Sequence, residues 1–380
     1  MGLLAAVGAE IDDVEQVVIR RHLTLGLLTR LPHGSTLSML HDLGTARGLS
    51  IEIERADATP TERALGSVVT VLARVITPDQ FEAIAEAVAS TGGNIDRIVR
   101  LSRYPVMSFE LTVLGAPIDA LRARLVSVAH EIGVDVAIQP DGLVRRSQRL
   151  VVLDVDSTLI QNEVIDLMAD ECGAGDAVAE ITAAAMAGEI DFASALTQRV
   201  RLLAGLDERA MRRAAERVVL TPGARTFVRT LKRMGFKVAI VSGGFTFVTD
   251  RLAADLDIDH AFANELELSD GRLTGAIVGP VVDRARKAAL LVEIADTEGI
   301  PLDQTIAVGD GANDLDMLAA AGLGIAFNAK QIVRDAADTA VNVPYLDALL
   351  YVLGVRRSEI EAADHADGAG PAGIRMPLLD

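Results

Sequence analysis

The sequence predicts an α/β protein built from a doubly wound, Rossmann-like parallel sheet with a helical cap, preceded by two small α+β units. Three observations support this prediction. After residue 148, short apolar runs alternate with helical patterns, as expected for parallel strands that are covered on both faces. Over residues 66–140, the expected elements follow the order βαββαβ. Part of that pattern also occurs nearer the N-terminus, which predicts a repeat.

The complete α+β unit is expected over residues 66–140. A β-branched run predicts its first strand, and helical spacing alternates with extended runs after it. The expected elements are the strand Val68–Val75, the helix Pro78–Ala89, the strands Ile95–Leu101 and Val106–Val113, the helix Ile118–Ile132 and a closing strand that reaches Gln139.

The other unit is expected over residues 1–60 and is predicted to be incomplete. Glu10–Leu27 resembles Asn94–Leu111 at an offset of about 84 residues, and a helical stretch near Met39 and a strand at Leu49–Glu54 should follow. There is no room before Gly2 for an opening strand. A start codon assigned too far downstream is the alternative explanation.

The parallel-sheet domain is expected over residues 148–354. Its strands are predicted at Leu150–Val155, Lys237–Ser242, Thr305–Gly309 and Leu323–Phe327. Residues 163–222 are helical in pattern throughout, which predicts either a cap over the rim of the sheet or ordinary crossover helices. Asp270-Gly271 lies between two extended runs and predicts a β-ribbon. Residues 355–380 are expected to form a flexible tail.

Composition excludes several classes of function. The net charge of −18 and the pI near 4.8 oppose binding to nucleic acid, which requires clustered cations. The only cysteine, Cys172, excludes an intramolecular disulfide and a multi-cysteine metal site, and favours the cytoplasm. The apolar start lacks the pattern of a signal peptide, and no apolar stretch is long enough to cross a bilayer, so no membrane partner is expected.

Carboxylates follow two of the predicted strands. Asp154 and Asp156 come at the end of one strand, where alternation should place them on the same side. Asp310 and Asp314 follow another strand in a Gly-rich loop. An oxygen-rich cluster of this kind suits Mg²⁺, whereas the ligands are too dispersed for a contiguous Ca²⁺ loop. A turn with helix-capping Asp residues is the plain alternative for either segment.

Two further segments could bind phosphate. Ser242, Gly243 and Gly244 close a third strand, and a hydroxyl with unobstructed backbone N–H groups could hold phosphate oxygens. Lys287 follows in an Arg-rich helix, where a solvated helix face is the plain alternative.

In their order, these four segments resemble the successive motifs of the haloacid-dehalogenase-like phosphatases. Within that family, three further segments, 158–166, 185–192 and 199–203, resemble the phosphoserine phosphatase subgroup. The similarity covers residues 150–353. The resemblance implies phosphoserine as substrate and Mg²⁺ as cofactor, with phosphothreonine, phosphohomoserine or a non-catalytic amino-acid sensor as the alternatives.

The resemblance also implies roles for the residues of the four motifs. Asp154 would be the nucleophile and Asp156 the acid and base. Asp154, Asp310 and the backbone carbonyl of Asp156 would hold Mg²⁺, with Asp314 supporting the metal shell or orienting Lys287. Ser242 and Lys287 would hold the phosphoryl oxygens.

The remaining implied roles concern the amino-acid end of the substrate. Glu163 would bind the ammonium group and Arg199 the carboxylate, although the two could be a surface pair. The amides of Gly243 and Gly244 and the side chain of Asn313 would assist. Met186 and Phe192 would close an apolar wall, although ordinary helical core is the rival interpretation.

The α+β units resemble ACT domains, which pair side by side and bind amino-acid effectors. The Gly-containing effector loop of that family has no counterpart in Ile76-Thr77-Pro78-Asp79-Gln80. A missing first strand should leave a sheet edge unpaired, and a homodimer is therefore expected.

Overall fold

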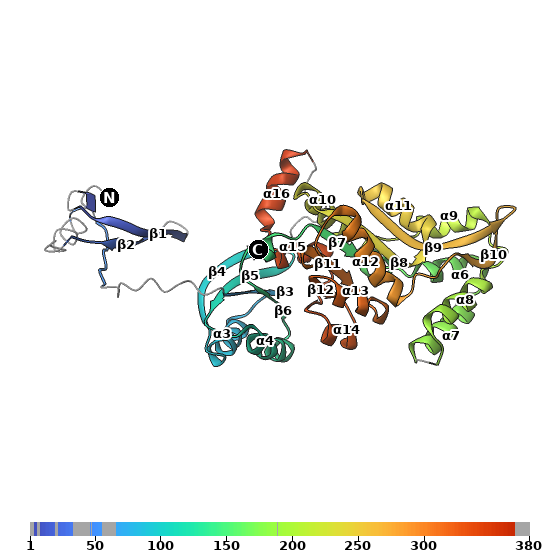
Figure 1. The fold of residues 1–380 in the computed structure, drawn as a ribbon, viewed down its shortest axis with the longest axis horizontal. Helices are drawn as coiled ribbons and strands as arrows, with labels where there is room; N and C mark the ends of the chain where they lie inside the picture. The colour runs from blue at the N-terminus through green and yellow to red at the C-terminus, as the bar shows by residue number, and fades with distance from the viewer. Residues whose placement is uncertain are drawn as a thin grey trace, which may run out of the picture. The chain divides into compact units, whose positions relative to one another are not determined.

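A computed structural model describes residues 4–5, 8–19, 22–32, 46, 48–54, 66–187 and 189–368. The chain divides into two compact units, Met1–Glu62 and Arg63–Asp380. In the first unit, β1 (Glu10–Ile19) and β2 (His22–Arg30) form an antiparallel hairpin (Figure 1). No helix in the described part of the chain is long and apolar enough to cross a membrane.

The prediction of a strand at Leu49–Glu54 is wrong, because these residues have no regular secondary structure. Their alternation of Ile and Glu is typical of a strand, but a strand also needs a hydrogen-bonded partner. The corresponding strand of the second α+β unit pairs with that unit's opening strand. The described residues of the first unit contain no such opening strand. The helix expected near Met39 lies outside the described residues.

The predicted order βαββαβ is confirmed for the second α+β unit, and its sheet has the strand order β4-β5-β3-β6 with all neighbours antiparallel. Both helices cover one face of the sheet, where a separate core forms around Leu111, Leu121 and Leu125. The elements are β3 (Ser67–Ala73), α3 (Pro78–Ser90), β4 (Asn94–Ser102), β5 (Met107–Leu114), α4 (Ile118–Ile132) and β6 (Asp135–Pro140).

A seven-stranded sheet in the order β10-β9-β8-β7-β11-β12-β13 forms the centre of the larger domain, and all its pairs are parallel except β9 with β10. The strands are β7 (Leu150–Leu153), β8 (Lys237–Phe245), β9 (His260–Ser269), β10 (Arg272–Val278), β11 (Thr305–Gly309), β12 (Leu323–Phe327) and β13 (Thr339–Val341). The sheet is therefore parallel over its central strands, as predicted.

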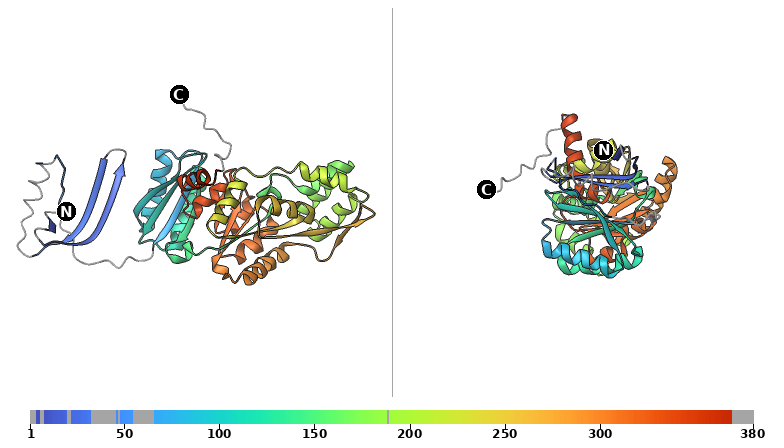
Figure 2. Two further views of the ribbon diagram at one scale, coloured as in Figure 1. Left: turned by 90° about the horizontal axis from the view of Figure 1, so that it is seen from above. Right: turned by 90° about the vertical axis from the view of Figure 1, so that its left-hand side faces the viewer.

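Helices cover both faces of this sheet (Figure 2). Val151 and Leu153 of β7 point to one core, while Leu150 and Val152 point to the other, as alternation along a strand requires. One face carries α10 (Ala224–Arg233) and α11 (Thr246–Leu256), and the other carries α12 (Arg284–Glu298), α13 (Leu315–Ala320) and α14 (Gln331–Ala336). The short helices α5 (Leu143–Arg146) and α15 (Leu349–Val352) complete the domain.

Four helices follow β7 and gather at one end of the sheet, which favours the cap over the crossover interpretation (Figure 1). They are α6 (Val164–Cys172), α7 (Gly175–Met186), α8 (Phe192–Leu202) and α9 (Glu208–Glu216). The predicted β9–β10 ribbon reaches them: Gly205 donates to the carbonyl of Leu273 at 2.8 Å, and Leu273 donates to that of Leu206 at 2.9 Å. The ribbon thus supports the cap.

The prediction of a flexible tail from residue 355 is wrong for Arg357–Ala366, because these residues form the helix α16. Ile360 of this helix is buried, and the carboxylate of Asp364 pairs with Arg229 at 2.7 Å and with Arg233 at 2.6 Å. Both partners lie on α10, more than a hundred residues earlier, so local sequence could not indicate them. Residues 369–380 lie outside the described part of the chain.

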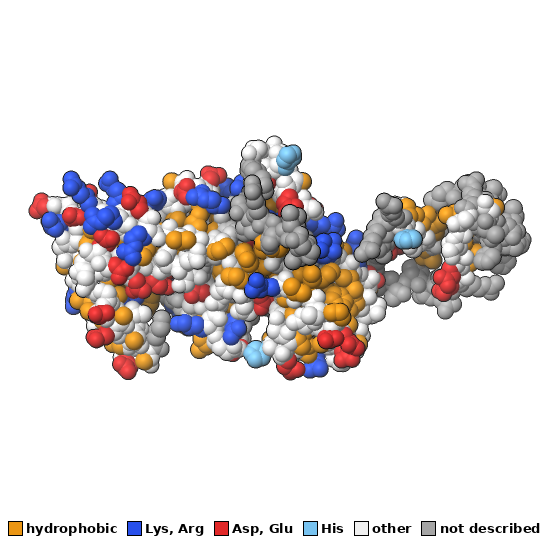
Figure 3. All heavy atoms as spheres, turned by 180° about the vertical axis from the view of Figure 1, so that it is seen from behind, with side chains coloured by type: hydrophobic (Ala, Val, Ile, Leu, Met, Phe, Trp, Pro, Cys, Tyr) orange, Lys and Arg blue, Asp and Glu red, His pale blue; other side chains and the backbone are white. Residues whose placement is uncertain are grey.

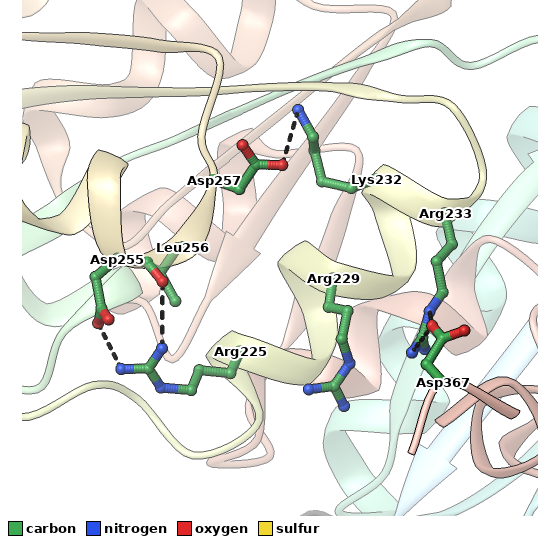
Figure 4. A pocket seen from close by; sticks show the side chains of 8 residues that line it. All are labelled: Arg225, Arg229, Lys232, Arg233, Asp255, Leu256, Asp257 and Asp367. Carbon is green, nitrogen blue, oxygen red and sulfur yellow. Dashed lines mark hydrogen bonds and ion pairs between the residues drawn. The ribbon is translucent and has the colours of Figure 1, made fainter. Parts of the chain in front are cut away.

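The basic face of α10 lines a groove (Figure 4). Its cations are paired: Arg225 with Asp255, Lys232 with Asp259 at 2.7 Å, and Arg233 with Asp367 at 2.6 Å. These ion pairs connect α10 to α11, to the start of β9 and to the end of α16.

Candidate active site

Asp154 lies directly after β7, the middle strand of the sheet. Its backbone N–H donates to the carbonyl of Val308 at 2.9 Å, which extends the pairing with β11 by one residue. The chain then turns tightly through residues 155–159, with Ser157 at a φ of 59°. Asp154 is 4% exposed, and its Oδ1 accepts from the N–H of Val155 at 2.7 Å.

Asp310 and Asp314 come from the loop after β11, the neighbouring strand. The hydroxyl of Thr158 donates to Oδ1 of Asp310 at 2.9 Å, and Gly311 N–H donates to Oδ2 of Asp314 at 3.0 Å. A Cβ on Gly309 would lie 2.4 Å from the Asp314 carboxyl carbon, so this glycine permits the close approach. Oxygens of Asp154, Asp310 and Asp314 lie within 4.8 Å of one another.

Lys287 is fully buried, which excludes a solvated helix face. Its Nζ lies 2.7 Å from Oδ1 of Asp154 and 2.7 Å from Oδ1 of Asp314. Burial alone would lower the pKa of Lys287, but the charges of the two carboxylates outweigh burial and raise it. The lysine is therefore held as a cation beside Asp154, and Asp314 orients it.

The cluster carries more negative than positive charge. Burial, together with the charge of Asp314, raises the pKa of Asp154 well above its usual range and raises that of Asp310 to about 6. Three carboxylates face one ammonium group, so a bound cation would offset the excess of negative charge. Hard carboxylate oxygens in this number fit a divalent ion such as Mg²⁺. Since both oxygens of Asp314 accept hydrogen bonds, Asp154 and Asp310 are the better metal ligands.

Asp156 reaches the site through the tight turn after β7, and not by alternation along the strand as predicted, because β7 ends at Leu153. Its Oδ1 accepts from the N–H of Val164 at 2.8 Å, and its Oδ2 accepts from the hydroxyl of Ser242 at 3.1 Å. Burial and the nearby charge of Glu163 raise the pKa of Asp156 to about 7.

Ser242, Gly243 and Gly244 lie at the end of β8, next to Asp156. Gly244 N–H donates to the Ser242 hydroxyl oxygen at 2.8 Å. A Cβ on Gly244 would lie 2.8 Å from Oδ2 of Asp156, and a Cβ on Gly243 would lie 2.8 Å from the tip of the Phe192 ring. Glycine at both positions permits these close approaches, and Phe192 of the cap contacts this loop.

The residues predicted to bind the amino-acid end come from the cap and its entrance. Oε1 of Glu163 accepts from the Ser157 hydroxyl at 2.8 Å. The Nη1 of Arg199 donates to the Thr182 hydroxyl at 3.4 Å, while its buried Nε has no hydrogen-bond partner within the described residues. No ion pair joins Glu163 to Arg199 within the described part, so a simple surface pair does not describe them.

The two remaining predicted residues are Asn313 and Met186. Asn313 lies on the Asp310–Asp314 loop, where its Oδ1 would be 2.1 Å from a Cβ on Gly311. Met186 ends α7, and its side chain lies outside what the structure describes.

The sequence alone did not indicate several residues that organise the site. Thr158 donates a hydrogen bond to Asp310, and Ser157 donates one to Glu163. The position of Ser157 and Thr158 directly after Asp156 was the only sequence signal for these two roles. Thr182 contacts Arg199, and Asn264 of β9 bonds to the Gly243 and Gly244 carbonyls. These last two belong to no motif and become apparent only in three dimensions.

The geometry agrees with comparisons to known proteins. Residues 151–319 match the haloacid dehalogenase-like hydrolase family, and residues 66–139 match an ACT domain family. The chain is 52% identical to a phosphoserine phosphatase of Streptomyces coelicolor, over 95% of this chain and 89% of that protein. It is 49% identical to the phosphoserine phosphatase SerB2 of Mycobacterium tuberculosis, over 98% and 92%.

Two solved structures show the same likeness. One is described as a phospho-aspartyl intermediate analogue of phosphoserine phosphatase, with a TM-score of 0.52 and 42% identity over 54% of this chain and 98% of that one. The other is a probable phosphoserine phosphatase from Vibrio cholerae in unliganded form, with a TM-score of 0.61 and 34% identity over 79% and 88%. The chain therefore belongs to the phosphoserine phosphatases of the haloacid dehalogenase-like hydrolase family and carries an ACT domain.

Proposed function

We propose that this protein hydrolyses O-phospho-L-serine to L-serine and phosphate, the last step of serine biosynthesis, through a phosphoryl group carried on Asp154. The observation that carries the proposal is the buried Asp154 carboxylate, which pairs with Lys287 at 2.7 Å. The cap also contains Arg199, whose buried Nε has no hydrogen-bond partner within the described residues. The relatives named above support the same reaction.

In the first step, a carboxylate oxygen of Asp154 attacks phosphorus as the bond from phosphorus to the seryl oxygen breaks. Asp156 gives its proton to the departing oxygen, and serine leaves as an alcohol. Asp156 is suited to this role because its hydrogen bonds to Val164 and Ser242 fix it between the cap and the phosphate loop, residues 242–244.

In the second step, water attacks the phosphorus of the aspartyl phosphate. The ionised Asp156 takes a proton from that water, the bond from phosphorus to the Asp154 oxygen breaks, and phosphate is released with both carboxyl groups restored. The Ser242 hydroxyl, the amides of Gly243 and Gly244, and the Lys287 ammonium would hold the phosphoryl oxygens throughout.

Asp154, Asp310 and the backbone carbonyl of Asp156 would hold Mg²⁺, and Asp314 would support them through Lys287 and Gly311. When bound, the metal neutralises charge so that a carboxylate can approach a phosphate monoester. The excess of buried negative charge at these residues supports this assignment.

At the amino-acid end, we assign the substrate carboxylate to Arg199 and its ammonium group to Glu163. Burial lowers the pKa of Arg199, while the charges of Glu163 and Asp166 act in the opposite direction. A bound carboxylate would compensate the buried guanidinium. Phe192 and Met186 would enclose the serine methylene, and Asn313 would assist in binding the amino-acid end. Phosphothreonine and phosphohomoserine carry the same two groups and are the competing substrates.

We also propose that two copies of the chain associate. Strand β4 is an edge of its sheet, where it has β5 as its neighbour, and Ile98 on it is 48% exposed. Hydrophobic side chains also gather on the face of the molecule that is turned away from the viewer in Figure 1 (Figure 3). Light scattering should give twice the monomer mass at micromolar concentration, and a monomer would contradict the proposal.

The test of function is phosphate release from a panel of phosphorylated amino acids and sugars. We expect phosphoserine to be among the best substrates, activity to disappear with a chelator and return with Mg²⁺, and Asp154→Asn to lose turnover while keeping its melting temperature. The proposal fails if phosphoserine is a poor substrate or if Asp154→Asn keeps parental turnover.

A further inference from the structure

The pairing of β8 with β9 is interrupted where β8 reaches the phosphate loop, residues 242–244. Val241 lies opposite Phe262, but Phe245 lies opposite Asn264, so three residues of β8 stand opposite Ala263 alone. A regular ladder cannot serve the backbone groups of these three residues. Backbone carbonyls that are shielded from water need hydrogen-bond donors, so a group outside the strand ladder must provide these donors.

The side chain of Asn264 supplies these donors. It is 1% exposed, and its Nδ2 donates to the carbonyl of Gly243 at 2.8 Å and to that of Gly244 at 3.3 Å. Its Oδ1 accepts from the N–H of Val282 at 2.8 Å. A side-chain amide is the group that can donate twice and accept at the same time, and the reversed amide would place N–H against N–H.

The first consequence concerns the direction of the loop amides. In a planar trans peptide, the C=O of one residue and the N–H of the next point in opposite directions. Because Asn264 holds the carbonyl of Gly243, the N–H of Gly244 points away from it, toward the Ser242 hydroxyl at 2.8 Å. That hydroxyl in turn donates to Asp156. Asn264 therefore sets the orientation of a chain of groups that ends at Asp156.

The second consequence concerns α12. Val282 directly precedes Asp283, whose side chain caps α12 by accepting from the N–H of Arg286 at 2.8 Å. Lys287 lies in the first turns of this helix and contacts Asp154 and Asp314. One buried side chain thus joins the segment that carries Ser242 to the segment that positions Lys287.

We propose that Asn264 is a positioning residue of the phosphatase reaction, which holds the phosphate loop and the start of α12 at the separation that a phosphoryl group requires. It acts through Gly243, Gly244 and Val282 and contacts neither the substrate nor Asp154. The proposal rests on the proposed function, because it assigns phosphoryl binding to these two segments.

The test compares Asn264→Asp and Asn264→Ser with the parent. The carboxylate introduced by Asn264→Asp is nearly isosteric with the amide and keeps the acceptor for Val282, but it lacks both donors. Asn342→Ser is the matched control, because the side-chain amide of Asn342 also donates a hydrogen bond, to Oδ1 of Asp135 at 2.7 Å, and lies outside the phosphate loop. The readouts are kcat and KM for phosphoserine and for p-nitrophenyl phosphate, and inhibition by inorganic phosphate.

We expect Asn264→Asp to lower kcat/KM by about 10–100-fold, equally for both substrates, because misplaced binding groups raise the barrier whatever the leaving group is. The inhibition constant for phosphate should rise, and Asn264→Ser should show a smaller change. Asn342→Ser should behave as the parent does. Parental kinetics and phosphate inhibition in both Asn264 variants would overturn the proposal.

Inorganic phosphate should raise the melting temperature of the parent, because it binds the folded protein. The size of this rise measures phosphate binding by folded molecules. It therefore distinguishes a positioning role of Asn264 from a purely structural one. Loss of this rise in the Asn264 variants supports the proposal. Lost activity with a parental rise, or no cooperative melting in either variant, would mark Asn264 as merely structural and overturn it. If the parent cleaves the aryl phosphate but not phosphoserine, the proposed function fails while the phosphate readouts still decide the role of Asn264.

Discussion

At the scale of single residues, Arg199 links the geometry of the site to the choice of substrate. Its Nη1 makes a long 3.4 Å hydrogen bond to Thr182, and its buried Nε lacks a partner in the described part of the chain. A guanidinium group is best satisfied by two parallel bonds to a carboxylate. Phosphoserine offers that carboxylate, and a simple aryl phosphate does not.

We therefore predict that Arg199→Ala lowers kcat/KM for phosphoserine by about 10–100-fold, the loss expected for charge-assisted hydrogen bonds worth about 1.5–3 kcal/mol. Its activity on p-nitrophenyl phosphate should stay at the parental level. Arg201→Ala, which removes an exposed arginine from the same helix, is the control and should leave both activities unchanged. Equal losses on both substrates in Arg199→Ala would contradict the recognition role.

The sequence predicted the residues that belong to short motifs and could not predict those that act across the fold. Asp154, Ser242, Lys287 and Asp310 follow strands or open a helix in recognisable segments, and the structure brings them together. Asn264 and Thr182 act through contacts that depend on how β9 and α7 pack, and no local pattern records such contacts.

At the scale of elements, local sequence was sufficient for the buried central strands, but not for elements whose structure depends on a partner distant in the sequence. The apolar strands at the centre of the large sheet are buried on both faces, and the sequence predicted them to within a few residues. The helix α16 is rich in charged residues, and its position depends on ion pairs with α10. Leu49–Glu54 has the period of a strand and no strand to pair with.

The contact of α16 with α10 gives a prediction of stability. Asp364 is buried between Arg229 and Arg233, so Asp364→Asn should lower the free energy of unfolding by about 1–3 kcal/mol in urea denaturation. Asp367→Asn removes a carboxylate that is 59% exposed and should cost about 0–1 kcal/mol. Equal effects of the two changes would show that burial of the pair is unimportant.

The same pair predicts a dependence on pH. Burial would raise the pKa of Asp364, but hydrogen bonds from Arg233 and Arg229 lower it on balance. The unfolded chain then binds the proton more tightly, so this stabilisation is present above the unfolded pKa and is lost as pH falls. The difference between the parent and Asp364→Asn should be full near neutral pH and shrink as pH falls below about 4. A difference that grew in acid would contradict this account.

At the scale of the whole molecule, the ACT-like module and the catalytic domain share part of their core. Leu72, Leu101 and Val106 of the module belong to the same buried cluster as Tyr351. Arg145 of α5 pairs with Glu110 of β5 at 2.5 Å. The partners of these contacts are distant in sequence, so the docking of the two domains could not be predicted.

This arrangement predicts different results for two truncations. A chain of residues 63–380 should keep parental kcat/KM for phosphoserine, because every described residue of the site lies in that unit. A chain that starts at residue 148 should melt at a lower temperature, because the apolar side chains that pack against the module become exposed. Parental melting of the shorter chain would show that the shared core contributes little.

The central claim is that Asp154 carries the phosphoryl group during hydrolysis of phosphoserine. The most direct measurement is to quench the protein in acid during turnover, digest it and search the peptide that contains Asp154 for phosphate by mass spectrometry. We predict phosphate on Asp154 in the parent and on no residue in Asp154→Asn, which should also release no phosphate. Steady turnover of phosphoserine without phosphate on Asp154, or in Asp154→Asn at the parental rate, would contradict the account.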